Sequence, residues 1–151
     1  MLQRLKILFL CTGNSCRSQM AEGWARHLCG DMLEPYSAGI EARGLDRRAV
    51  RVMAEAGVDI AGQRSKRLEE LKGITFDCVV TLCDHAQEHC PVFPGRTRAV
   101  HAGFDDPPTL ARDAQTEEEA LSHYRRVRDE IGGFVETLPE SLNRNPGVAR
   151  S

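Results

Sequence analysis

Short apolar runs alternate along this chain with segments in which apolar residues recur at helical spacing. Residues 5–10 form a short apolar run that ends at a glycine-containing turn, which is typical of a buried strand in a parallel sheet. Residues 76–82 form a second strand pattern rich in β-branched side chains, and weaker runs at residues 34–38 and 97–101 predict two more strands. A helical or polar segment follows each of these runs.

Helices are predicted at residues 18–29, 45–56, 84–90 and 117–138. In the first helix, Met20, Trp24 and Leu28 recur four residues apart and predict one apolar face. The last helix is the longest, and its apolar face is expected to contain Ala120, Tyr124, Val127, Ile131, Phe134, Val135 and Leu138. Glycine and proline predict a loop at residues 103–108, and the acidic stretch at residues 110–120 is expected to be a solvated excursion.

Alternating strands and helices predict an α/β fold. We expect a single domain over residues 1–142, with a four-stranded parallel sheet flanked by helices, and a flexible tail at residues 143–151. Sheets of this kind bind ligands beyond the carboxyl ends of their strands. The segment at residues 11–17 and the segment around Cys83 both fall at such ends.

Composition narrows the class of function. The 151 residues carry a net charge of −2, which gives no electrostatic footprint for nucleic acid. No apolar run reaches the roughly 18 residues that span a membrane, and the N-terminal run is too short for a signal peptide, so a cytoplasmic protein is expected. In a reducing cytoplasm, the six cysteines are expected to be catalytic, metal-binding or buried rather than a disulfide framework.

The strongest chemical signal is the segment from Cys11 to Arg17, between the first strand and the first helix. Backbone N–H groups of a loop that opens a helix, together with the helix dipole, bind anions. Here that loop consists of Thr12, Gly13, Asn14, Ser15 and Cys16. Gly13 and Asn14 tolerate the left-handed backbone of a tight anion nest.

Arg17 would hold an oxyanion with its planar fork, directly above Cys11 as the nucleophile. The same field favours the thiolate of Cys11 over its thiol. Ser18 is expected to cap the helix and to donate a hydrogen bond to this thiolate. The alternative is a plain turn after a buried strand, which the placement between strand and helix disfavours.

These residues carry a family resemblance. The stretch Cys-Thr-Gly-Asn-Ser-Cys-Arg-Ser from Cys11, followed by Gln-Met-Ala-Glu-Gly, resembles the thioredoxin-coupled arsenate reductases. That family shares its fold with the low-molecular-weight protein tyrosine phosphatases. Residues 36–39, 83–91, 103–107 and 124–131 extend the resemblance over nearly the whole chain.

The resemblance implies a thiol cascade. Cys11 attacks arsenate, Cys83 attacks the Cys11 sulfur and releases arsenite, and Cys90 then attacks Cys83 to leave a disulfide that thioredoxin reduces. Seven helical steps would separate the Cα atoms of Cys83 and Cys90 by about 10 Å. A disulfide tolerates about 7 Å, so the helix predicted there must unwind during the cycle.

Other interpretations of these cysteines stay open. Zinc is a rival, because Cys83, His85, His89 and Cys90 are all potential ligands, but adjacent ligands at 89 and 90 make one tetrahedral centre awkward, and we expect no metal. Both histidines are expected to face solvent. Cys16 is either a packing residue or a redox partner for Cys11, and Cys29 and Cys78 are expected to fill the core.

The leaving oxygen needs a proton donor. Asp106 precedes Pro107, as the general acid does in both families, and we favour it over its neighbour Asp105. The phosphatases carry aromatic residues after this Asp-Pro pair to sandwich a phenol ring. Here Pro108, Thr109 and Leu110 follow, which favours a small inorganic oxyanion.

No cofactor is expected. One subgroup of the reductases binds potassium through residues that match Asn14, Glu22 and Ser37, but Lys66 stands where that subgroup has an aspartate, so potassium is not favoured. A tyrosine or aryl phosphatase is the alternative activity, and a non-catalytic oxyanion or redox sensor is a third. Thioredoxin is favoured over a glutathione or mycothiol system as reductant because three protein thiols make the last disulfide internal. A monomer is the default.

Overall fold

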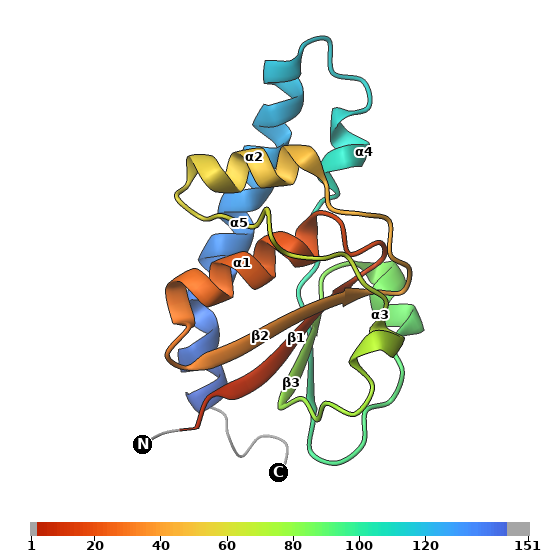
Figure 1. The fold of residues 1–151 in the computed structure, drawn as a ribbon, viewed down its shortest axis with the longest axis vertical. Helices are drawn as coiled ribbons and strands as arrows, with labels where there is room; N and C mark the ends of the chain where they lie inside the picture. Colours follow the sequence, from red (N-terminus) through yellow and green to blue (C-terminus); the bar gives the residue numbers. More distant parts are fainter. Residues whose placement is uncertain (1–2, 145–151) are drawn as a thin grey trace.

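Four parallel strands form one central sheet (Figure 1) in the computed structural model, which describes residues 3–144. The strands are β1 (Leu5–Cys11), β2 (Leu33–Gly39), β3 (Cys78–Thr81) and β4 (Arg98–His101), in the order β2-β1-β3-β4. Cys11 pairs with Gly39, and Leu10 pairs with Thr81, so β1 and its neighbours end at one edge of the sheet. The predicted α/β class and its four parallel strands are confirmed.

β1 is central because both of its faces are buried. Ile7 and Phe9 point into one apolar cluster, while Leu8 and Leu10 point into a second cluster on the opposite face, and all four are fully buried. Each such side chain contributes about 1.5–3 kcal/mol on leaving water. The continuous apolar run in the sequence follows from this double burial.

Helices cover the two faces unequally. The larger cluster lies beneath α1 (Arg17–Cys29), α2 (Arg47–Glu55) and α5 (Glu117–Arg144), whereas α3 (Asp84–His89) and the 3-10 helix η1 (Leu68–Leu71) border the smaller one (Figure 1). No helix within residues 3–144 is long and apolar enough to cross a membrane.

The predicted apolar face of α1 is confirmed for Met20, which is fully buried, and for Trp24, which packs against the core, but it is wrong for Leu28. Leu28 is 40% exposed, and the buried row is Ala21, Ala25 and Cys29, one residue further along the helix. Two side chains of α1 meet α5. Trp24 donates a hydrogen bond from Nε1 to the Arg128 carbonyl oxygen at 3.0 Å, and Cys29 Sγ lies 3.9 Å from the Val135 carbonyl oxygen.

Two boundaries in the last third of the chain were predicted wrongly. Residues Pro107–Ala111 form a helix, α4, instead of continuing the loop. Pro107 stands at its first position, where the missing N–H is not needed and the fixed φ suits a helix. In addition, α5 continues beyond residue 138 to Arg144, so residues 143 and 144 belong to it, and the rest of the expected tail lies outside the described residues.

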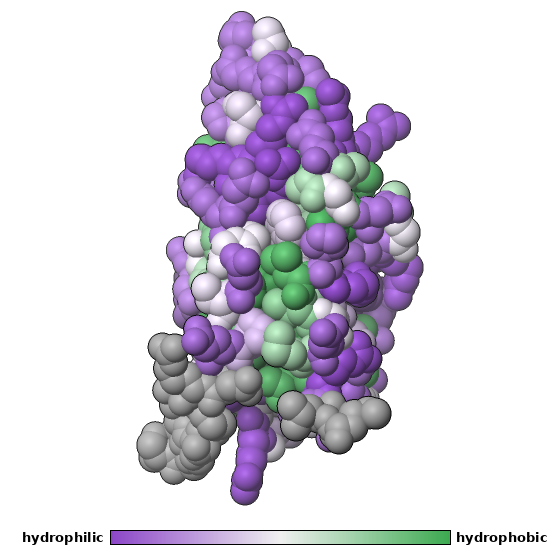
Figure 2. Space-filling view, turned by 90° about the vertical axis from the view of Figure 1, so that its left-hand side faces the viewer, coloured by the Kyte–Doolittle hydropathy of each residue, from purple (hydrophilic) through white to green (hydrophobic). Residues whose placement is uncertain are grey.

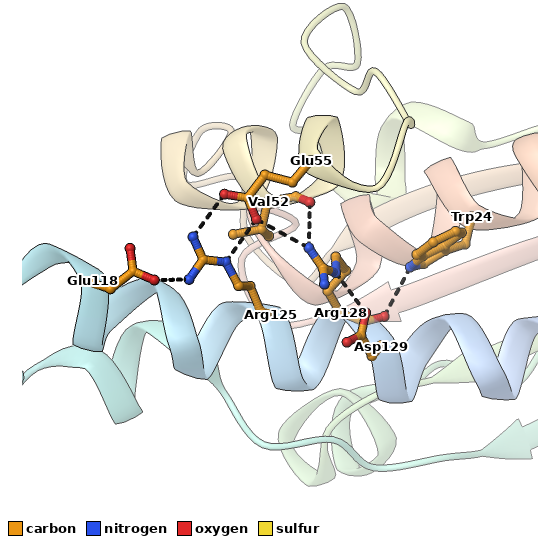
Figure 3. A network of polar contacts seen from close by, with 7 residues as sticks. All are labelled: Trp24, Val52, Glu55, Glu118, Arg125, Arg128 and Asp129. Carbon is orange, nitrogen blue, oxygen red and sulfur yellow. Dashed lines mark hydrogen bonds and ion pairs between the residues drawn. The ribbon is translucent and has the colours of Figure 1, made fainter.

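Ion pairs clamp α2 onto α5 (Figure 3). Arg125 forms a bidentate pair with Glu55 at 2.8 and 2.9 Å and also pairs with Glu118. Arg128 donates to the Val52 carbonyl oxygen at 2.9 Å. The upper part of the side view in Figure 2, which contains α2, α4 and the first turns of α5, is mainly hydrophilic. This clamp fixes α2, whose first turn adjoins the site described next.

Candidate active site

The segment from Cys11 to Arg17, called here the oxyanion loop, connects the end of β1 to the start of α1. Within residues 3–144, no recorded backbone hydrogen bond is donated by the N–H groups of residues 13 to 16. Asn14 has φ 49° and so takes the left-handed conformation expected of it. Gly13 does not, so the prediction for that residue is wrong, and its lack of a side chain has another reason, given below.

The Asn14 side chain holds the oxyanion loop in place through hydrogen bonds in the protein interior. Its side chain is fully buried and donates from Nδ2 to Ser18 Oγ at 2.7 Å, while its Oδ1 accepts from Gln19 Nε2 at 3.0 Å and from the Lys66 N–H at 2.9 Å. The Ser18 oxygen thus already accepts one hydrogen bond. Its own proton is free for Cys11, whose Sγ lies 2.9 Å away.

Ser18 therefore contacts the nucleophile, but it does not cap α1. The cap position is Cys16, which makes no side-chain capping hydrogen bond. The prediction of a Ser18 cap is wrong because its hydroxyl is turned toward Cys11. Ser18 and Cys11 are both buried, which strengthens a hydrogen bond between them.

Arg17 is fixed by two partners and keeps one nitrogen free. Nη1 donates to the Phe104 carbonyl oxygen at 2.9 Å, and Nη2 lies 3.3 Å from Asp106 Oδ1. Its Nε is buried with no hydrogen-bond partner among the described residues. A buried unpaired N–H is costly, so this atom indicates a ligand position occupied by an acceptor such as an oxyanion.

The two candidate acids point in different directions. Asp106 lines the same pocket as Cys11 and Arg17, and its Oδ2 accepts from Thr109 Oγ1 at 2.6 Å. Asp105 instead pairs with Arg126 on α5 at 3.0 Å. Of the two carboxylates, only that of Asp106 is placed to exchange a proton with a bound oxyanion.

The pocket is small and polar. It has a volume of about 260 Å³ and is lined by Cys11, Thr12, Gly13, Ser15, Cys16, Arg17, Arg43, Asp106 and Pro108. None of these described lining residues is aromatic, and Pro108 occupies the wall after the acid. A pocket below the usual range of about 300–1,000 Å³ suits a small inorganic anion.

A neighbouring segment, residues 40–46, holds the oxyanion loop from outside; we call it the rim segment. Four backbone N–H groups donate to successive loop carbonyls: Ile40 to Cys11 at 3.1 Å, Glu41 to Thr12 at 2.8 Å, Arg43 to Gly13 at 2.9 Å and Asp46 to Ser15 at 3.0 Å. Gly39 permits this approach, because a Cβ there would lie 2.2 Å from the Glu41 carbonyl oxygen. No local sequence pattern indicates this pairing.

Asp46 ends the rim segment and starts α2. Its Oδ1 accepts from the Arg48 and Ala49 N–H groups at 2.8 and 3.3 Å, and its Oδ2 accepts from the Tyr124 hydroxyl at 2.7 Å. Burial, followed by this hydrogen bond, raises the pKa of Tyr124 above its usual range. The tyrosine therefore stays protonated and keeps the carboxylate in place.

Cys83 is brought against the oxyanion loop. Its Sγ lies 3.3 Å from Thr12 Oγ1 and accepts from the Ala86 N–H at 3.4 Å, at the start of α3. Cys90 caps the other end of this short helix, and burial raises the pKa of its thiol. All six cysteines are free thiols in this structure.

The three remaining cysteines are buried, and the two α3 histidines are exposed as predicted. Cys29 and Cys78 are buried as expected, and burial raises the pKa of Cys78 to about 11. Cys16 lines the pocket but is buried, and burial raises its pKa well above the usual value. The rings of His85 and His89 stack at 4.2 Å, and residues 3–144 contain no group of three side chains that could hold a metal ion.

Together, a parallel α/β sheet, a cysteine at a strand end, an anion loop and a buried arginine define a cysteine enzyme that acts on oxyanions. Residues 6–148 match the family model described as low molecular weight phosphotyrosine protein phosphatase. The chain belongs to this family.

Known relatives give finer detail. An arsenate reductase of Halalkalibacterium halodurans is 50% identical over 135 residues, which cover 89% of this chain and 95% of that protein. An arsenate reductase of Bacillus subtilis has the same identity and coverage. Among solved structures, an arsenate reductase in the phosphate binding state has a TM-score of 0.71 at 30% identity, and the match covers 91% of this chain and 98% of that one.

Proposed function

We propose that this protein reduces arsenate to arsenite through a thiol–disulfide cascade. The observation that carries the proposal is the position of Cys83, whose sulfur lies 3.3 Å from the hydroxyl of Thr12, the residue next to Cys11. A phosphatase has no use for a second thiol at this point. A reductase needs one, because the two electrons that arsenic gains must come from a pair of thiols.

The first step forms a bond between Cys11 Sγ and arsenic. Arsenate occupies the oxyanion loop, where the free N–H groups and Arg17 Nε bind its oxygens. The Cys11 thiolate attacks, and an arsenate hydroxyl leaves as water after taking a proton from Asp106. The Ser18 hydroxyl, 2.9 Å from the sulfur, stabilises the thiolate before the attack.

The second step transfers the electrons. Cys83 attacks Cys11 Sγ, the sulfur–arsenic bond breaks, and its electron pair stays on arsenic, which leaves as arsenite. Cys90 then attacks Cys83 and frees Cys11, which leaves a Cys83–Cys90 disulfide. Cys90 must approach across α3, a helix whose only buried residue is Ala86 and which therefore unwinds at low cost.

We propose thioredoxin as the dithiol that reduces this last disulfide, and a monomer that works in the cytoplasm without a resident cofactor. The residues that match the potassium ligands of related reductases do not fit that ion. Glu22 already accepts from Ser37 at 2.5 Å and from Arg26 at 2.6 Å, and the Lys66 ammonium lies nearby with its pKa lowered by burial.

Single-turnover chemistry tests the cascade. Reduced wild-type protein mixed with arsenate and no reductant should release one arsenite per chain. Cys90→Ser should also release one but fail to turn over with thioredoxin, thioredoxin reductase and NADPH, whereas Cys83→Ser should release none. Cys29→Ala is the matched control, a buried cysteine outside the pocket, and should behave as wild type. Release of arsenite by Cys83→Ser would refute the cascade.

Hydrolysis of aryl phosphates is the second candidate activity, because Cys11, Arg17 and Asp106 also suit phosphate transfer. We expect it to be weak, since no aromatic side chain among the described pocket residues would hold a phenol ring. A wild-type protein that is inactive with arsenate and fast with aryl phosphates would make phosphate hydrolysis the first candidate activity and arsenate reduction the second.

A further inference from the structure

The pocket contains a second arginine that the catalytic steps do not use. Arg43 comes from the rim segment and lines the pocket together with Cys11, Arg17 and Asp106. Its side chain is 58% exposed, and its Nη2 lies 2.6 Å from Glu41 Oε2. The sequence pattern gave no reason to single it out, since it lies in a polar stretch between a strand and a helix.

Contacts with the oxyanion loop fix where Arg43 starts and which way its stem runs. Its N–H donates to the Gly13 carbonyl oxygen at 2.9 Å, within the series of four bonds that the rim segment makes. Its methylene groups then cross Gly13, because a Cβ at that residue would lie 2.8 Å from Arg43 Cδ and 3.1 Å from Cγ. This crossing explains why position 13 has no side chain, although its φ is ordinary.

The resting partner of Arg43 is weakly held. Glu41 and Arg43 are both 58% exposed, and exposed pairs of this kind contribute little because water and salt screen them. An oxyanion in the pocket carries up to two negative charges and is shielded from water by the loop. It therefore competes well against the Glu41 carboxylate for the same guanidinium.

We propose that Arg43 is a further substrate-binding residue that holds a tetrahedral oxyanion at the pocket mouth, with Glu41 as the carboxylate that the substrate displaces. The inference rests on the proposed function only for the identity of the oxyanion. Arg43 binds substrate and transition state alike, so it lowers KM and leaves kcat unchanged.

Binding to an inactive protein tests this inference without any turnover. In the Cys11→Ser background, calorimetric titration with inorganic phosphate should give a Kd about 5- to 10-fold higher for Arg43→Gln than for the parent, with Arg43→Lys in between. The difference should shrink at high salt. Arg47→Gln is the matched control, since it removes the same charge from an exposed residue outside the pocket and should leave the Kd unchanged.

Glu41→Gln provides a test of opposite sign. Loss of the competing carboxylate should lower the phosphate Kd, whereas Glu69→Gln, which neutralises an exposed carboxylate on η1, should not. In the arsenate assay, Arg43→Gln should raise KM by the same factor as Kd with an unchanged kcat.

Equal phosphate Kd values for Arg43→Gln and Arg47→Gln would overturn the inference, as would a Glu41→Gln variant that binds more weakly than its parent. The two proposals fail separately. A wild-type protein that cannot reduce arsenate refutes the proposed function, and weaker phosphate binding by Arg43→Gln still supports the role of Arg43.

Discussion

Tyr124→Phe isolates one hydrogen bond that supports the active site from α5. Phenylalanine fills the same space, so no cavity forms, and the main interaction that the change removes is the bond from the Tyr124 hydroxyl to Asp46 Oδ2 at 2.7 Å. Hydrogen bonds to charged groups contribute about 1.5–3 kcal/mol, and the half-buried Asp46 regains some water, which favours the lower end. We expect a loss of about 1.5 kcal/mol in unfolding free energy and of about 3–6 °C in Tm.

A double-mutant cycle measures this bond directly. Asp46→Ala also removes the helix cap of α2, which adds about 0.5–2 kcal/mol to the loss. In Asp46→Ala, the Tyr124 hydroxyl has already lost its carboxylate acceptor and keeps only its interaction with Arg48, so adding Tyr124→Phe should cost much less than it does in wild type. The expected coupling is about 1.5 kcal/mol by urea unfolding of the reduced protein.

Tyr36→Phe is the matched control, because the hydroxyl of this second tyrosine also bonds a carboxylate, that of Glu34, but in a partly exposed pair outside the active site. It should change the unfolding free energy by less than about 0.5 kcal/mol. Additive effects of Tyr124→Phe and Asp46→Ala, or equal effects of the two tyrosine changes, would refute the reasoning.

The hydrogen bond between Tyr124 and Asp46 also makes the stability of the protein depend on pH in the alkaline range. The folded pKa of Tyr124 is raised, so its stabilisation is fully present below the unfolded pKa of about 10 and is lost as the pH rises above it. Tyr124→Phe should therefore lose less stability than wild type between neutral pH and pH values above about 10.

Three further results are expected. Ser18→Ala removes the hydroxyl 2.9 Å from Cys11 Sγ and should slow alkylation of Cys11 by iodoacetamide about 10-fold at neutral pH, as followed by mass spectrometry; an unchanged rate would remove Ser18 from the mechanism. Alkylation of Cys90 should keep accelerating above pH 9.0, because burial raises its pKa above that value, and a plateau below pH 9.0 would contradict this. Arg125 lowers the pKa of Glu55, so the stabilisation from this ion pair is present above the unfolded pKa of about 4.3 and is lost as the pH falls further. Glu55→Gln should therefore lose less unfolding free energy than wild type between neutral and acidic pH, as measured by urea unfolding. A larger loss in the variant would argue against the ion pair.

The sequence pattern predicted those parts of the fold whose residues are neighbours in the chain. The apolar run of β1 and the residues from Cys11 to Ser18 follow one another in the chain, so the strand, the loop and the helix start could all be deduced from order alone. The preference for Asp106 over Asp105 came from the family resemblance and not from local physics, since adjacent residues differ only by which one meets Arg17 and which meets Arg126.

The missed features depend on residues far apart in sequence. Tyr124 and Asp46 are 78 positions apart, and the contact between Arg43 and Gly13 exists only because β2 delivers the rim segment beside the loop. Leu28 was misplaced because the contacts of Trp24 and Cys29 with α5 fix the rotation of α1, which its own periodicity leaves open between adjacent rows.

The central position of β1 implies that amide hydrogens exchange with solvent slowly in this strand and faster at the edge of the sheet near α3. This strand is paired on both sides and buried on both faces, so its amide hydrogens should exchange with solvent only when the whole molecule opens. The α3 amides, beside a single buried residue, should exchange through local openings that are far more frequent. In the proposed cascade, the nucleophile would therefore rest on the slowest-exchanging backbone, while the two resolving thiols would lie at the ends of a segment that opens between turnovers.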